Sequence, residues 1–116
     1  MMTNIQIKNI LEQEYPVEYM TVGETAIDYM LDSEGQFSND STESGANLDL
    51  VEYVTIISGC IVTLKEGYDF IKGLSKDIRA KISPEEILRE IEGGTELSVE
   101  DKKKLIRKVL TIVSDD

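Results

Sequence analysis

The stretch that decides the fold is LDLVEYVTIISGCIVTLKEGYDFIKGLSKDIRAKI, residues 48–82, in which apolar residues recur at steps of three and four. The stripe consists of Leu50, Val54, Ile57, Ile61, Leu64, Tyr68, Ile71, Ile78 and Ile82, with a polar side chain, Ser75, at the one step between Ile71 and Ile78. This is the spacing of one face of an α-helix. The segment therefore predicts a long central helix. Gly59, Gly67 and Gly73 are the places where it could break, because each glycine destabilises a helix interior by about 1 kcal/mol relative to alanine.

A β-hairpin is the alternative for the first part of this stretch. β-branched residues dominate positions 51–63, and Ser58-Gly59 could form the turn between two short strands. A hairpin explains only residues 52–65, however, whereas a single helical stripe accounts for all of 48–82. The helix is therefore the preferred interpretation.

The first half of the predicted helix is apolar on nearly every side, since no charged residue occurs between Glu52 and Lys65. Such a helix must be surrounded by protein. A straight helix over 48–82 would be about 50 Å long, too long for one 116-residue chain to cover, so we expect a break or a dimer. The small pair Ser58-Gly59 would allow close approach of another backbone, from this fold or from a second copy. The residues predicted to mediate self-association are Ile57, Ser58, Gly59 and Ile61.

The flanking segments carry helix-capping signals. Thr3 with Gln6 predicts a helix from Asn4 to Glu14, and Thr21 with Glu24 predicts one that continues to Leu31. Ser83-Pro84 and Ser98 begin two further helices, Pro84 to about Glu92 and Val99 to about Val113. Alternating residues near positions 5–7 and 17–22 leave a short N-terminal β-hairpin open. The predicted fold is one all-α domain, 1–116, with about five helices around the central one.

Several kinds of function are excluded or disfavoured by composition. The chain has no histidine, no glycine-rich phosphate loop and no Cys-x-x-Cys pair, so we expect no enzyme activity, no cofactor and no metal site. Cys60, the single cysteine, is expected to be a buried apolar residue. We expect no secretory signal, because the opening residues lack a basic stretch followed by an apolar run. The most apolar run, residues 50–64, is shorter than the roughly 20 residues that span a bilayer. We therefore expect a cytoplasmic protein without membrane contact.

Residues 32–47 are rich in Ser, Gly and acidic residues and predict a flexible loop. Its oxygen-bearing residues match the spacing of a calcium-binding EF-hand loop, but Phe37 stands where that loop needs glycine. Calcium binding is therefore not expected. Next to this loop, Gly45-Ala-Asn-Leu-Asp-Leu-Val-Glu52 resembles the Asp-Ser-Leu-Asp-x-Val-Glu signature of acyl carrier proteins. Asn47 replaces the serine that carries phosphopantetheine there, and no site is transferred to this chain.

Charge is the feature that best indicates a function. The net charge is −11, and residues 1–50 contain ten acidic residues but one basic residue, Lys8. Such a surface repels nucleic acid and attracts basic partners. On the helix predicted to end at Leu31, Glu24, Asp28 and Asp32 follow one another at steps of four and so share one face. The residues predicted to bind a partner are Glu24, Asp28, Asp32 and Glu34.

The last predicted helix has a basic outer face, formed by Lys102, Lys103, Lys104, Arg107 and Lys108. In so acidic a chain, we expect these residues to meet acidic groups of the first half or of a second copy.

Two functions fit these observations. The first is a non-catalytic regulator or inhibitor that binds a basic protein surface, for example a DNA-mimicking inhibitor of phage type or an immunity protein against a basic toxin. The alternative is a helical assembly or adaptor module, a homodimer in its simplest form, that self-associates through the central helix.

Overall fold

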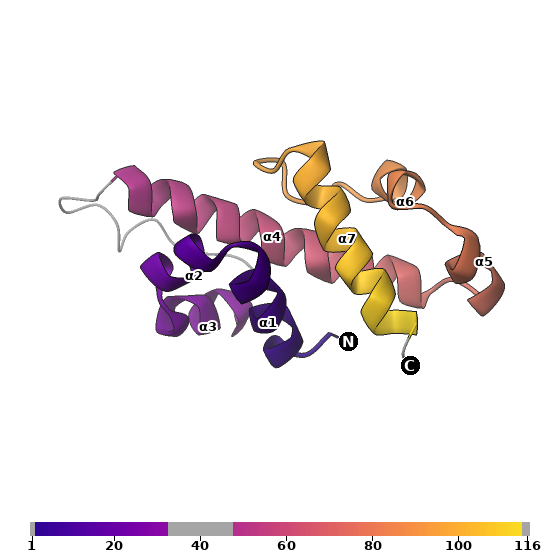
Figure 1. Ribbon diagram of the computed structural model, residues 1–116, viewed down its shortest axis with the longest axis horizontal. Helices are drawn as coiled ribbons and strands as arrows, with labels where there is room; N and C mark the ends of the chain where they lie inside the picture. The colour runs from indigo at the N-terminus through magenta and orange to yellow at the C-terminus, as the bar shows by residue number, and fades with distance from the viewer. Residues whose placement is uncertain (1, 33–47, 115–116) are drawn as a thin grey trace.

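The computed structural model describes residues 2–32 and 48–114, and these residues form seven helices and no strand (Figure 1). The helices are α1 (Asn4–Glu14), α2 (Pro16–Val22), α3 (Glu24–Asp32), α4 (Leu48–Lys72), α5 (Lys76–Lys81), α6 (Pro84–Glu90) and α7 (Val99–Ser114). The prediction of an all-α fold around a long central helix is confirmed. The predicted number of helices was too low, because α2 and α5 are separate helices.

Helix α4 lies along the long axis of a molecule that measures 51 × 24 × 21 Å (Figure 1). Helices α1, α2 and α3 pack against its first half, and α6 and α7 pack against its second half. Helix α5 lies at the far end and contacts α7. Two groups of helices that are separated in the sequence thus share α4 as a common core element.

The apolar stripe of α4 is buried between these groups. Ile57, Cys60, Ile61, Leu64 and Ile71 are fully inaccessible to solvent, and Val54 and Tyr68 are nearly so. At roughly 1.5–3 kcal/mol for each large apolar side chain, this burial is the main favourable contribution that α4 makes to folding.

The predicted break in the central helix occurs at Gly73. There the Gly73 N–H donates to the carbonyl groups of both Asp69 (3.3 Å) and Phe70 (3.2 Å), which ends α4. The Ser75 side chain then accepts the Ile78 N–H and caps α5. The predicted continuous stripe to Ile82 is therefore divided, and Ile78 is half exposed on α5.

Gly59 and Gly67 do not break α4, because other parts of the chain occupy the space that their side chains would fill. A Cβ atom on Gly67 would lie 2.5 Å from Cδ1 of Ile106 in α7. The backbone of Gly94, in the connection between α6 and α7, lies directly against the backbone of Gly59. The cost of two helical glycines is thus offset by close packing of the elements that follow α4.

Thr63 fixes the Gly94 backbone to α4. Its hydroxyl donates to the Gly59 carbonyl at 2.8 Å and accepts the Gly94 N–H at 2.8 Å. The preceding residue, Gly93, has φ +67°, a conformation that side chains disfavour. Both hydrogen bonds are buried, so the hydroxyl of this fully buried side chain has both a donor and an acceptor as partners.

The N-terminal β-hairpin was a wrong alternative, since residues 5–7 and 17–22 lie in helices α1 and α2. Thr3 and Gln6 form the predicted reciprocal capping box, with distances of 3.1 and 3.0 Å. Pro16 occupies the first turn of α2, where its missing N–H costs nothing. The apolar alternation was misleading because Ile5 and Val17 are exposed (70% and 60%).

Cys60 lies at the junction of the two groups of helices. It is buried, as predicted, and interacts with Tyr15, the residue between α1 and α2, which in turn interacts with Asp101 of α7. Burial raises the pKa of the Cys60 thiol to about 12 and raises that of Tyr15 above its usual value. Cys60 is therefore an unreactive thiol at neutral pH.

We predict that Gly94→Ala strongly destabilises the protein. The new Cβ would lie 2.5 Å from the Gly59 carbonyl oxygen, and neither backbone can move without breaking the Thr63 hydrogen bonds. We expect the free energy of unfolding to fall by about 3 kcal/mol. Gly73→Ala is the control, since its Cβ would be in ordinary contact at 3.4 Å. Urea denaturation of both variants checks this, and equal stabilities would contradict the close approach.

We also predict that stability falls between about pH 9 and pH 12. The unfolded thiol ionises near pH 9.0, whereas the folded thiol keeps its proton to about pH 12, so rising pH favours the unfolded state. One proton corresponds to about 1.4 kcal/mol per pH unit. Tyr15 acts in the same direction from a higher pH. Denaturation midpoints should fall less steeply with pH for Cys60→Ala than for the wild type. If the midpoints of the two proteins fell equally steeply, the buried Cys60 thiol would not be the cause of the pH dependence.

Candidate protein-interaction surface

The three acidic residues predicted on one face of α3 lie on its solvent side. The side chains of Glu24 and Asp28 are 64% and 48% exposed, and Asp32 is also exposed. The opposite side of α3 carries Ile27, Met30 and Leu31, all buried. The amphipathic spacing of this helix is thus what directs the carboxylates outward.

Lys8 of α1 connects two of these carboxylates. Its ammonium group donates to Oε1 of Glu24 at 3.0 Å and to Oδ1 of Asp28 at 2.9 Å. Hydrogen bonds to Asp28 and Glu24 raise the pKa of Lys8 above its usual value. One positive charge is shared by two negative charges, so this part of the surface stays negative while both carboxylates are held in place. The sequence offered one sign of this role, since Lys8 is the only base among residues 1–50.

Glu12 of α1 joins the same surface, which the spacing on α3 alone did not indicate. The phenol of Tyr19 in α2 is buried, and burial is the main reason that its pKa is raised. The charges of Glu24, Glu12 and Asp28 raise it further, so all three carboxylates lie near this ring. The surface formed by Glu12, Glu24, Asp28 and Asp32 is here called the acidic face.

Helix α3 is also fixed at its C-terminal end. Lys65 of α4 donates from its ammonium group to the Leu31 carbonyl at 3.1 Å. A lysine at this position satisfies a terminal carbonyl and the negative end of the helix dipole. The acidic face is therefore attached to the rest of the fold by Lys8 at one end of α3 and Lys65 at the other.

Several sequence predictions fall outside the described residues. Glu34, the calcium-like spacing and all of the predicted loop 32–47 except Asp32 belong to this part of the chain. The same holds for Asn47 and the beginning of the carrier-protein likeness, whereas α4 begins at Leu48. Among residues 2–32 and 48–114, no cluster of three or more His, Cys, Asp or Glu side chains is arranged to hold a metal ion.

The residues predicted for self-association are largely enclosed by the chain itself. Ile57 and Ile61 have no exposed surface, and Gly59 is covered by Gly94. The close backbone approach expected at Ser58-Gly59 is thus made within the fold. Ser58 is half-buried.

The basic residues of α7 make contacts mostly with their own half of the chain. Lys103 lies 3.3 Å from Glu85 and 3.5 Å from Glu100, and Lys104 lies 3.9 Å from Asp101. Lys108 reaches the first half, with its ammonium group 3.9 Å from Glu14. Each of these pairs has at least one well-exposed partner, and such pairs contribute little to stability, so they compensate charge more than they hold the fold together.

No helix within the described ranges combines the length and the apolar character needed to cross a membrane. The chain matches no protein-family model, no curated protein and no solved structure. Its function must therefore be argued from the surfaces described above.

We predict that Lys8→Gln lowers the melting temperature at low ionic strength, because Glu24 and Asp28 then repel each other without a shared cation. The difference from the wild type should shrink at about 0.5 M salt, where exposed charges are screened. Lys81→Gln, an exposed lysine on α5, is the matched control and should have a smaller effect. Thermal denaturation at two salt concentrations provides the measurement. A Lys8→Gln effect that is independent of salt would contradict an electrostatic role.

Proposed function

We propose that this chain is a non-catalytic protein-interaction module that binds a basic surface of a partner protein through the acidic face and thereby regulates or inhibits that partner. The observation that carries the proposal is the outward placement of Glu24 and Asp28, held in position by Lys8. Carboxylates that are already ordered lose less side-chain entropy when they bind Lys or Arg of a partner.

The wider charge distribution supports the same partner class. Residues 2–32 contain six acidic residues and one base. A surface with this excess charge attracts basic proteins over distances of about a Debye length and speeds their association. The pairing of Lys8 with two carboxylates does not remove this excess, since each group has ample exposed surface for further contacts.

A basic surface that otherwise binds nucleic acid is one partner of this kind, and a basic toxin is another. In the first case the protein would compete with nucleic acid for the partner, as a DNA mimic does. The alternative function, self-assembly through Ile57, Ser58, Gly59 and Ile61, has less support because the chain's own helices and Gly94 occupy most of that surface.

We predict that the triple variant Glu12→Gln, Glu24→Gln, Asp28→Asn weakens partner binding more than tenfold. The matched control is Asp69→Asn, Asp77→Asn, Glu90→Gln, which changes the net charge by the same amount at exposed sites away from the acidic face. Partners are captured from the host extract with the wild type, and the affinity of the purified partner is then measured for all three proteins.

The control variant should bind within about twofold of the wild type, and wild-type binding should weaken as salt is raised. Circular dichroism confirms that the variants are folded. Equal losses in the two triple variants would show that net charge alone determines binding and would overturn the assignment to the acidic face. Competition with nucleic acid then separates the DNA-mimic version from the others.

A further inference from the structure

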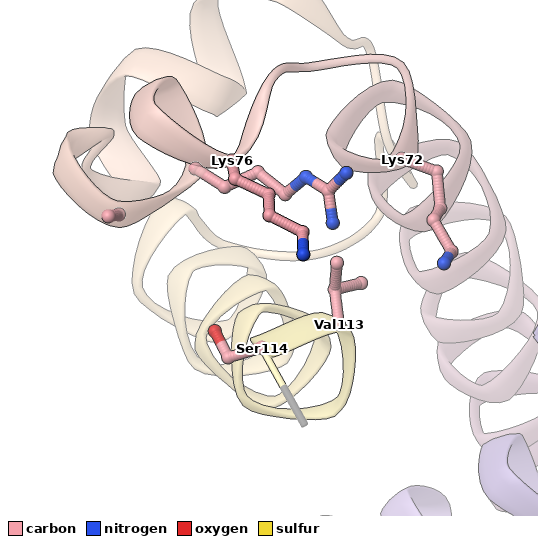
Figure 2. Close-up of a pocket in the computed structure, with 6 residues that line it drawn as sticks. Lys72, Lys76, Val113 and Ser114 are labelled. Carbon is pink, nitrogen blue, oxygen red and sulfur yellow. The ribbon is translucent and has the colours of Figure 1, made fainter. Parts of the chain in front are cut away.

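We draw no further inference here: the strongest candidate, the open pocket of about 420 Å³ that Lys72, Lys76 and Arg79 line where α4 ends beside α5 and the last turn of α7 (Figure 2), includes Ser114, and the two acidic residues that follow it in the sequence lie outside the described residues, so the described lining does not establish the positive excess that an anion site needs.

Discussion

The fold depends on the burial of the first part of α4, which has almost no polar surface of its own. A helix of this kind is stable only when protein covers it on several sides. Here α1–α3 cover one part and α6–α7 cover another, so the two halves of the chain are joined mainly through their contacts with α4. The connection between α6 and α7 packs closely on α4 at two residues. Gly59 has no side chain, so the Gly94 backbone can approach it, and the Thr63 hydroxyl accepts a hydrogen bond from the Gly94 N–H.

This arrangement also separates the charged surfaces. Helices α3 and α5 lie toward opposite ends of the 51 Å long molecule (Figure 1). The acidic face is at the α3 end, and the pocket lined by Lys72, Lys76 and Arg79 is at the α5 end.

Local signals located the helices that have strong caps. The Thr3 capping box predicted where α1 begins, and Ser83-Pro84 and Ser98 predicted where α6 and α7 begin. The signals failed at two of the short helices, α2 and α5. Thr21 lies inside α2 and does not cap α3, and the apolar period that continued to Ile82 concealed the separate helix α5. Hydrophobic period alone does not show whether a helix turns away from the core.

By itself, the sequence determined the all-α class, the central helix, the burial of Cys60 and the outward face of Glu24, Asp28 and Asp32. All of these depend on the spacing of residues within a single helix, which the sequence shows directly. Only the tertiary structure decided that Gly73 ends α4 while Gly59 and Gly67 do not, that Lys8 pairs with Glu24 and Asp28, and that three cations line one pocket. Those features depend on contacts between elements far apart in the chain, and no local pattern specifies which elements will meet.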